Sequence, residues 1–284
     1  MQIFDTHCHY NLEPLYSGKQ GYFSQKQITN INNQNWQSHW QKAKKEDVVA
    51  TLISGYDSNS SKRAVEIAEK DPNLFSSVGL HPVDGLSISS QQLEKDWMQI
   101  TKLVNNKQVK AVGETGLDYF HLPPKDFLIN SELQKKLFIQ HIQLANKYKK
   151  PLIIHVRDQK FQAHQDVANI IETNYQFIKP FVLHCVSGPA SYLKKMVKLG
   201  AYISFAGNIT YNSAQDLRDL IKLIPQDKLL IETDAPFLPP QKYRGQINQP
   251  YMIKETTLFM KKEFKINLDQ ILKNSYQFFD ITNI

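Results

Sequence analysis

Cysteine is scarce in this sequence, and its scarcity excludes two kinds of protein. Cys8 and Cys185 are the only cysteines among 284 residues. Two thiols are too few for the disulfide framework of a small secreted domain, and too few for a zinc site built from cysteine. We therefore predict a protein of a reducing compartment, the cytoplasm.

Long hydrophobic runs are also missing. No apolar stretch approaches the roughly 18–20 residues of a membrane span, and residues 1–7 lack the basic start and apolar stretch of a secretory signal peptide. Hydrophobic residues make up 41% and charged residues 21%, with 11 Gly and 13 Pro, which excludes disordered, collagenous and coiled-coil chains. We predict no membrane partner, and infer no obligate protein partner.

Acidic residues are outnumbered by basic ones. The chain has 34 Lys and Arg against 27 Asp and Glu, which gives a net charge of +7. This is a mild bias towards anionic partners, and it does not separate DNA from RNA.

What the sequence has is a regular alternation of short apolar runs and longer amphipathic segments. This pattern is typical of strand–helix units repeated around a parallel sheet. Eight such units predict an α/β fold, a closed (β/α)₈ TIM barrel in which 1–284 form one domain. The predicted strands are 2–7, 48–54, 75–80, 109–114, 151–155, 180–184, 201–205 and 228–232. The predicted helices are 35–45, 61–70, 91–105, 132–149, 165–174, 190–199, 214–224, 251–264 and 268–279.

One segment interrupts the alternation. Residues 10–35 are polar and rich in Asn, Gln and Tyr, and they lie between the first predicted strand and its helix. A loop of this length inside a compact domain is usually functional or locally disordered. We predict an insertion at the rim of the barrel, or a lid.

Residues suited to binding metal ions stand at the ends of five predicted strands. Residues i and i+2 of a strand share a face, so His7 and His9 should both point into the barrel mouth while Cys8 points away as a buried thiol. Active sites of such barrels lie at the carboxyl ends of the strands. Nitrogen and oxygen ligands for two divalent ions are present there. The other candidates are Glu114, His155, His184 and Asp234.

The remaining histidines fall elsewhere in the pattern. His81 follows the third predicted strand, and both a structural role and a substrate-contacting one stay open for it. The other four fall in predicted helices or loops, where we expect surface or packing roles: His39, His121, His141 and His164.

Six short motifs together resemble those of the TatD family of metal-dependent deoxyribonucleases. They are DTHCH at 5–9, GLHP at 79–82, GETGLDY at 113–119, PLIIHVR at 151–157, HCVSG at 184–188 and ETDAP at 232–236. The resemblance implies a metal-dependent hydrolase that cleaves phosphodiester bonds in DNA, commonly as a 3′–5′ exonuclease, with a metal-activated water.

By motif position, the resemblance also implies two metal sites that share Glu114. His7, His9 and Asp234 would complete one site. His155 and His184 would complete the other. We expect Asp234 to orient or accept the proton of the water, and Glu114 to set the spacing of the ions. Asp234 and Glu114 are therefore the predicted catalytic residues.

The metal itself stays open between Mg²⁺, Mn²⁺ and Zn²⁺. The family is usually described as magnesium-dependent, whereas imidazole ligands suit zinc or manganese better than magnesium. We expect a site that accepts several divalent ions.

Basic residues after two of the strands should rim the mouth and contact phosphates. Arg157 follows the fifth strand, and Arg244 lies in a segment after the eighth that also resembles the family. Together with His81 they are the predicted substrate-binding residues. Lys160 and Lys242 are expected to be solvated loop charges, and Tyr119, Phe120 and Tyr243 are candidates for stacking on bases.

Three features depart from the family pattern, all on the substrate face. Tyr10-Asn11 replaces the usual Leu-Asp after His9, the segment 10–35 is longer than usual, and the segment after Arg157 is extended.

Two other functions therefore stay open. One is hydrolysis of a small amide, lactone or phosphoester by a related barrel, whose members often bridge the ions with a modified lysine; here Lys110 lies at the start of its strand. The other is nucleic-acid binding without catalysis.

Overall fold

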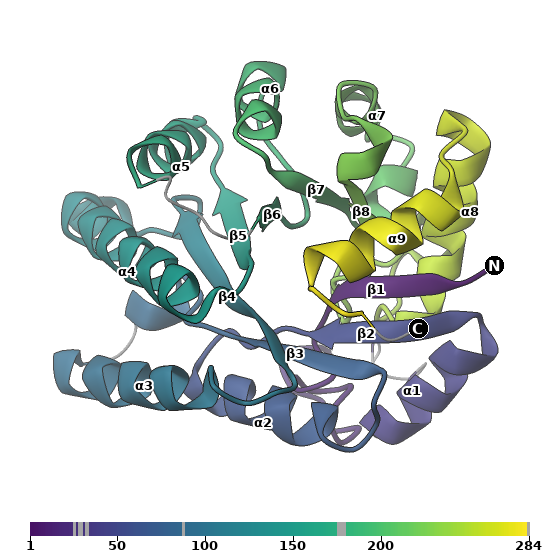
Figure 1. The fold of residues 1–284 in the computed structure, drawn as a ribbon, viewed down its shortest axis with the longest axis horizontal. Coiled ribbons are helices and arrows are strands. Elements are labelled where there is room, and N and C mark those ends of the chain that lie inside the picture. Colours follow the sequence, from purple (N-terminus) through teal and green to yellow (C-terminus); the bar gives the residue numbers. More distant parts are fainter. Residues whose placement is uncertain (25–26, 28–30, 32–33, 87–88, 175–179, 283–284) are drawn as a thin grey trace.

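Eight parallel strands pair in chain order in a computed structural model of the protein (Figure 1). The structure describes residues 1–284 except 25–26, 28–30, 32–33, 87–88, 175–179 and 283–284. The predicted α/β barrel fold and its eight strands are confirmed. The strands are β1 (Ile3–Cys8), β2 (Val48–Ile53), β3 (Leu74–Val78), β4 (Val109–Asp118), β5 (Leu152–Arg157), β6 (Phe181–Leu183), β7 (Tyr202–Phe205) and β8 (Leu229–Ile231).

Helices follow the strands and lie around the outside of the sheet (Figure 1). Several begin at a residue whose side chain accepts hydrogen bonds from the free amides of the first turn. Asn35 does so for α1 and Asp57 for α2, where Ser60 completes a capping box. The helices are α1 (Trp36–Lys45), α2 (Ser58–Ala68), α3 (Ser90–Leu103), α4 (Phe127–Tyr148), α5 (Gln162–Thr173), α6 (Ala190–Lys198), α7 (Gln215–Ile221), α8 (Ile253–Phe264) and α9 (Leu268–Phe278).

Several elements extend beyond their predicted bounds, among them α4 and β4. Helix α4 begins at Phe127 rather than at residue 132, and strand β4 continues past Glu114 to Asp118. Residues 115–118 pair with β5 from Ile154 to Arg157. The extension of β4 places Asp118 on the sheet rather than in a loop, which matters for the site described below.

The two edges of the sheet meet through contacts just beyond β1 and β8. The Asp234 amide donates to the His7 carbonyl at 2.9 Å, and the His9 amide donates to the Ala235 carbonyl at 2.8 Å. The buried Asp5 carboxylate accepts from the amide and hydroxyl of Thr233 at 2.9 and 2.7 Å. These bonds bring the two ends of the barrel domain together and place His7, His9 and Asp234 side by side.

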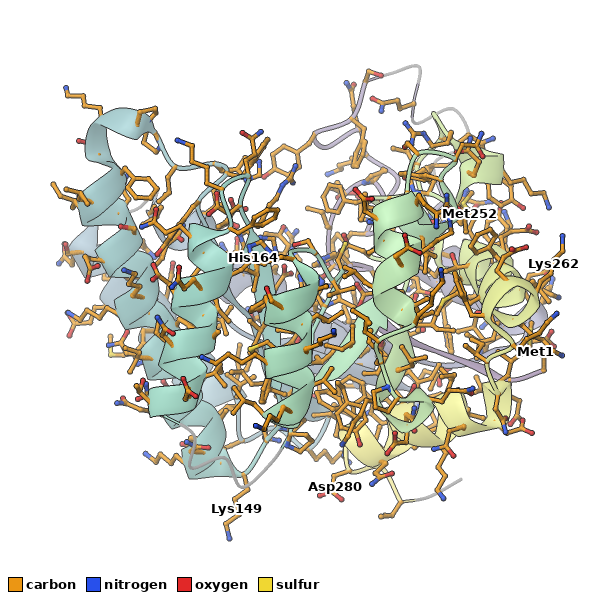
Figure 2. All side chains as sticks on the ribbon, turned by 90° about the horizontal axis from the view of Figure 1, so that it is seen from above. Met1, Lys149, His164, Met252, Lys262 and Asp280 are labelled. Atoms are coloured by element: carbon orange, nitrogen blue, oxygen red, sulfur yellow. The ribbon has the colours of Figure 1, made fainter. Side chains whose placement is uncertain are left out.

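The amino-terminal end of the barrel is filled with apolar side chains. Every strand contributes one or two buried residues to this cluster, and three residues from the end of the chain close it: Tyr276, Phe278 and Phe279. Helix α9 accordingly packs against β1 and β8. Lys149, which ends α4, and Asp280, which follows α9, mark this end of the molecule in the side view (Figure 2). No helix in the described ranges is long and apolar enough to cross a membrane.

The segment 10–35 is anchored in the core where the structure describes it. Tyr10, Leu15 and Ile31 are each fully buried. Tyr22, in contrast, is 85% exposed. The part of the predicted insertion at 25–26, 28–30 and 32–33 lies outside the described residues, so its function as a lid stays a prediction.

Candidate metal centre

All six predicted metal ligands lie together at the carboxyl ends of β1, β4, β5, β6 and β8. Glu114 projects from β4 into the middle of the group. Gly113 precedes it with φ +124°, and a Cβ there would stand 2.5 Å from the Ile153 carbonyl oxygen of β5. Only glycine fits this conformation so close to the neighbouring strand, so the glycine lets β4 bring Glu114 to the centre.

One half of the site comes from both ends of the chain. His7 Nε2 and His9 Nε2 lie 3.2 Å apart, so both rings point to one place, as predicted. Asp234 Oδ1 lies 3.4 Å from His9 Nε2 and 3.8 Å from His7 Nε2. Asp234 holds a left-handed backbone with φ +53°, which aspartate tolerates better than most residues.

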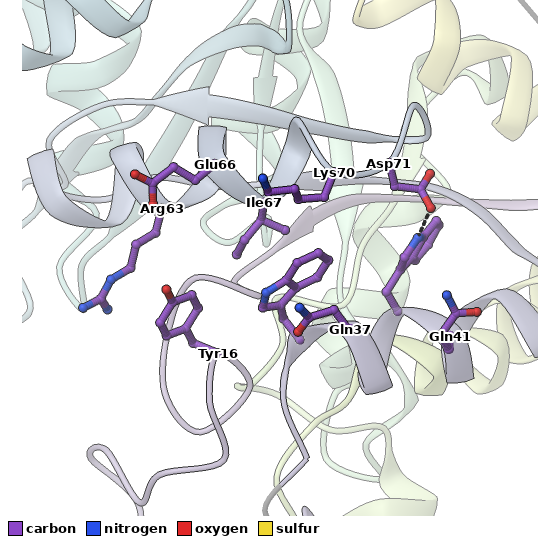
Figure 3. A pocket seen from close by; sticks show the side chains of 10 residues that line it. Tyr16, Gln37, Gln41, Arg63, Glu66, Ile67, Lys70 and Asp71 are labelled. Carbon is purple, nitrogen blue, oxygen red and sulfur yellow. Dashed lines mark hydrogen bonds between the residues drawn. The ribbon is translucent and has the colours of Figure 1, made fainter.

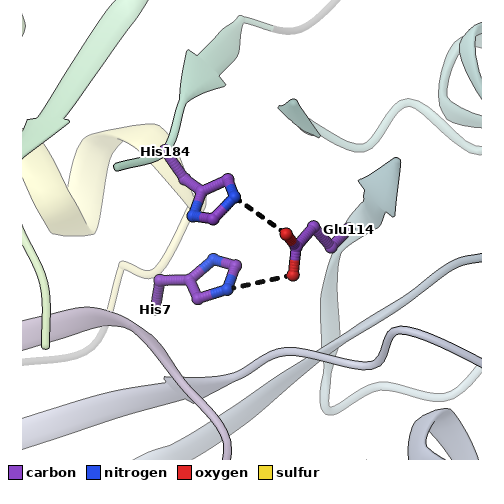
Figure 4. Close-up of side chains that lie close together, drawn as sticks. All are labelled: His7, Glu114 and His184. Atoms are coloured by element: carbon purple, nitrogen blue, oxygen red, sulfur yellow. Dashed lines mark ion pairs between the residues drawn. The ribbon is translucent and has the colours of Figure 1, made fainter. Parts of the chain in front are cut away.

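The other half comes from the middle of the chain. His184 Nε2 lies 2.8 Å and His155 Nδ1 3.1 Å from Glu114 Oε1, while the other oxygen, Oε2, lies 3.3 Å from His7 Nε2. Figure 4 shows His7 and His184 facing opposite oxygens of this carboxylate. One carboxylate thus faces both histidine pairs, an arrangement that suits a ligand shared by two ions.

The charges in the site stabilise one another. Burial opposes ionisation of Glu114, but the charge of His184 and hydrogen bonds from His155, His184 and His7 hold its pKa well below the usual value. Burial likewise opposes ionisation of Asp234, and His9 and His7 lower its pKa. Both carboxylates are therefore ionised at neutral pH and attract cations.

The donor set fits divalent transition metals. Each ion would receive imidazole nitrogens and carboxylate oxygens, which zinc and manganese accept and magnesium accepts less readily. Within each of three groups the possible ligand atoms lie within 4.8 Å of one another: His7 with Glu114 and His184, His7 with His9 and Asp234, and His81 with Asp118 and His155. The nitrogens of His7 and His9 approach each other at 3.2 Å, a spacing that one shared cation would relieve.

Sequence reasoning missed the groups that hold these ligands in place. Asp118 Oδ2 lies 3.1 Å from His155 Nε2, the ring nitrogen that faces away from Glu114. Burial opposes ionisation of Asp118, but His155 and His121 lower its pKa. A carboxylate on the far nitrogen of a metal-binding histidine fixes the orientation of the ring. The signal was present, because Asp118 stands four residues after Glu114 and shares its face if the strand continues.

Glu232 plays a similar part for His184. Its Oε1 lies 3.5 Å from His184 Nδ1 and accepts from the Cys185 amide at 2.7 Å. Glu232 is the last residue before the Thr233-Asp234 pair that approaches β1, so it also ties β6 to the end of β8.

The cluster forms the floor of a cavity of about 650 Å³. Two of the three predicted substrate-binding residues line it. His81 Nε2 lies 3.7 Å from Glu114 Oε1, and the Arg157 guanidinium lies 4.3 Å over the ring of Phe120 at the rim. Arg244 is not among the lining residues; its guanidinium lies 4.2 Å over the Tyr211 ring. Contact of these residues with substrate stays a prediction.

The remaining histidines divide between core and cavity. His39, His141 and His164 are buried packing residues, as expected. His121 is 45% exposed, but its Nδ1 lies 2.8 Å from Asp118 Oδ2 and the residue lines the cavity, so it is more than an ordinary surface residue. The extension of β4 causes this difference, because it carries the chain to the cavity rim before the turn.

The structure also shows the surroundings of four other residues that were considered from the sequence. Cys8 is fully buried, as predicted, and Lys242 pairs with Glu255 at 2.7 Å in solvent. Lys110 Nζ lies 5.7 Å from the Phe75 ring centroid at the apolar end of the barrel, remote from Glu114. Tyr119 is buried and donates its hydroxyl to Asp166 at 2.8 Å, so it is a packing residue.

A second cavity, of about 430 Å³, lies between α1 and α2 (Figure 3). Several residues that line it contact one another. Trp40 Nε1 donates to Asp71 at 2.7 Å, and the Arg63 guanidinium lies 4.8 Å over the Tyr16 ring. None of its lining residues is a histidine. Of these two cavities, the larger is therefore the one lined by candidate metal ligands.

A sequence profile of the family described as TatD related DNase matches residues 4–280. The chain belongs to this family. Among TatD relatives, the uncharacterized metal-dependent hydrolase YabD of Bacillus subtilis (strain 168) is 33% identical over 253 residues, 89% of this chain and 87% of YabD. The corresponding hydrolase MG009 of Mycoplasma genitalium is 31% identical, over 98% of this chain and 99% of its own. The protein is a TatD-family metal-dependent hydrolase.

Solved structures agree with this assignment. YjjV, a TatD homologue from Escherichia coli K12, superposes with a TM-score of 0.80 at 26% identity, over 99% of this chain and 98% of its own. A phosphotriesterase homology protein from Escherichia coli, solved with phosphate in its active site, superposes with a TM-score of 0.61 at 15% identity over 98% of both chains. At that identity the second likeness shows the shared barrel fold alone.

Proposed function

We propose that this TatD-family hydrolase is a deoxyribonuclease that holds two divalent ions and removes nucleotides from the 3′ end of DNA. The observation that carries the proposal is the orientation of the Glu114 carboxylate. One of its oxygens faces His7, and the other faces His155 and His184. When bound, two ions supply an activated water and neutralise charge on the phosphate and the leaving oxygen.

Residues of the chain then have distinct roles. His7, His9 and Asp234 would hold one ion, His155 and His184 would hold the other, and Glu114 would be shared by both. Asp234 is less buried than the histidines beside it, with a side chain 13% exposed, so it can orient the water and accept its proton. In the metal-free protein, His9 and His7 lower the pKa of Asp234, so the carboxylate is ionised there.

The rim supports an anionic substrate. Arg157 is exposed and lines the cavity, its guanidinium lies over the Phe120 ring, and we expect it to bind a phosphate of the substrate. Glu114 of β4 faces both histidine pairs, whereas Lys110 lies at the start of the same strand, and this argues against the lysine-bridged site of many small-molecule hydrolases. We also propose that the protein is located in the cytoplasm, as predicted from the cysteine count.

An assay on the purified full chain tests the proposal. Single-stranded and duplex DNA labelled at the 5′ end are incubated with Mn²⁺, Mg²⁺, Zn²⁺ or EDTA. A metal-dependent ladder that shortens from the 3′ end supports the proposal. Intact DNA with every ion, together with turnover of a small phosphoester or amide, would assign the site to the alternative class. Elemental analysis of protein purified without added metal identifies the ion.

A further inference from the structure

The active-site cavity has two unlike walls. On one side Tyr22, Tyr56 and Phe237, here called the aromatic wall, line the cavity together with Leu12 and Leu238. On the other side most lining residues are ionisable or polar, among them Asp84, Asp118, His121, His155 and Arg157, although Val156 and Val186 also line the cavity. The metal ligands Glu114, His184 and Asp234 line the same cavity.

The aromatic wall adjoins the metal centre directly. The His9 ring meets the Tyr56 ring edge-on with centroids 5.8 Å apart, and it meets the Phe237 ring edge-on at 6.2 Å. Phe237 follows Asp234 by three residues, and its amide donates to the Asp234 carbonyl at 2.8 Å. A group bound at the metal ligands therefore lies next to these rings.

Two members of the wall are left exposed. Tyr22 is 85% exposed and Phe237 is 39% exposed, although both are large and aromatic. Phe23 packs behind Phe237, with centroids 5.9 Å apart and a tilt of 37°. The segment 10–35 thus supplies one ring of the wall and supports another. Apolar surface left open at the mouth of a polar site is typical of a surface that a ligand covers.

A nucleotide matches this division in chemistry. It joins a flat base, which stacks on aromatic rings, to phosphates, which bind metal ions and guanidinium groups. A small polar ester would leave the aromatic wall uncovered.

We propose that the aromatic wall binds the base of the 3′-terminal nucleotide by stacking, so that Phe237 and Tyr22 determine how well the enzyme uses a strand end. The scissile phosphate then lies at the metal ligands, and the next phosphate lies towards Arg157. This proposal rests on the deoxyribonuclease function proposed above, and it adds a role for the segment 10–35.

Two DNA strands that differ only in stacking test the proposal. One ends in thymidine and the other in 5,6-dihydrothymidine, which keeps the hydrogen-bonding groups of thymine but has no aromatic ring. The wild-type enzyme with Mn²⁺ should prefer thymidine in kcat/KM by about 5- to 150-fold, the range expected for one stacked base. Phe237→Leu, which keeps apolar bulk, and Tyr22→Ala should bring the ratio close to 1. Leu128→Ala, on a 77% exposed residue of α4, should keep the wild-type ratio.

A second readout needs no turnover. A strand with 2-aminopurine at its 3′ end should lose fluorescence when it binds to the EDTA-treated wild-type protein, because stacking quenches the probe. The quenching should be weaker with both wall variants. The Tyr22 variant guards against a folding defect, since so exposed a side chain contributes little to stability.

The outcomes separate this proposal from the one it rests on. If the thymidine-ended strand is cut but the preference is absent, or is unchanged in both wall variants, the aromatic wall does not bind the base and the nuclease function stands. If neither strand is cut with any ion, both proposals fail together.

Discussion

The two ends of the barrel interior are built from the same eight strands and are chemically opposite. At the amino-terminal end, the Phe4 ring packs against Phe75, Tyr276 and Phe279, with ring centroids 5.2 to 6.0 Å apart. At the carboxyl end, histidines and carboxylates approach one another at 2.8 to 3.8 Å. One end is closed by the chain itself, and the other opens into a cavity of about 650 Å³.

This difference shows that burial stabilises the fold at one end of the barrel and costs free energy at the other. Burying large apolar rings stabilises the fold without any partner. Burying a charge costs several kcal/mol unless another charge or a metal ion compensates it. The carboxyl end is therefore held together by mutual pairing, and its residues are suited to binding cations rather than to packing.

The largest expected effect comes from removing the shared carboxylate. Glu114→Gln keeps the shape but loses the charge that faces both histidine pairs. We expect hydrolysis to fall at least about 1000-fold, because bound ions supply several kcal/mol of transition-state stabilisation. Bound metal per protein should fall as well. Glu66→Gln, on the exposed face of α2, is the matched control. A variant with full metal content and turnover within tenfold of wild type would contradict the assignment.

The apolar end is tested by Phe278→Ala. Phe278 is 1% exposed and packs against Tyr202 and Phe279 with centroids 5.1 and 4.8 Å apart. The free energy of unfolding in urea should fall by about 3–5 kcal/mol, as for other buried phenylalanines. Leu258→Ala, 44% exposed on α8, should change it by about 0.5 kcal/mol or less. An equal loss for the two variants would show that this end is not a packed core.

A smaller effect is expected from the residue that orients a ligand. Asp118→Asn weakens the hydrogen bond to His155 Nε2 and leaves all six ligands in place. Affinity for Mn²⁺ or Zn²⁺, measured by calorimetry, should fall about 10- to 100-fold at one of two sites. Asp227→Asn, an exposed change just before β8, should bind both ions as the wild type does. Equal affinities in Asp118→Asn and wild type would leave Asp118 a purely structural residue.

The smallest effect concerns a buried histidine outside the site. Burial lowers the pKa of His141 to about 4, since its ring lies in the helix layer without a carboxylate, with Nε2 accepting from the Leu80 amide. Below pH 6.5, His141 binds a proton in the unfolded chain but stays neutral in the folded chain until the pH approaches 4. Stability is therefore complete above pH 6.5 and falls as the pH drops towards 4, by about 1 kcal/mol per pH unit for this residue.

His141→Gln checks this expectation, because glutamine can still accept from the Leu80 amide but does not titrate. Urea unfolding at pH 7, 6 and 5 should show a shallower loss of stability for the variant. His39 and His164, whose pKa values burial also lowers to about 4, contribute to the slope that remains. Parallel curves for variant and wild type would mean that His141 is protonated in the folded protein.

Much of the fold followed from local pattern. All eight strands were predicted because buried parallel strands are short apolar runs, which stand out from the amphipathic helices between them. The end of β4 was misplaced because Gly113 and Gly116 interrupt its apolar run, whereas both glycines serve close approach to β5. The start of α4 was missed because Leu128 and Ile129 face solvent, so the first turn lacks the expected apolar stripe.

The candidate ligands could also be predicted, because each stands at the end of a strand and the fold brings those ends together. The aromatic wall could not. Tyr22, Tyr56 and Phe237 lie in loops with no periodic pattern, and nothing local distinguishes them from Tyr119, which the structure buries. Loop conformation depends on packing between distant segments, such as Phe23 against Phe237.

The sequence alone determined the order of elements, the family motifs and the types of ligand, since these depend on residue identity and short-range periodicity. Only the tertiary structure decided which oxygen of Glu114 faces which histidine, that Asp118 supports His155, and which aromatic residues border the cavity. The physical reason is that these relations join residues from different strands and loops, and they exist only when the barrel closes and brings their side chains within contact distance.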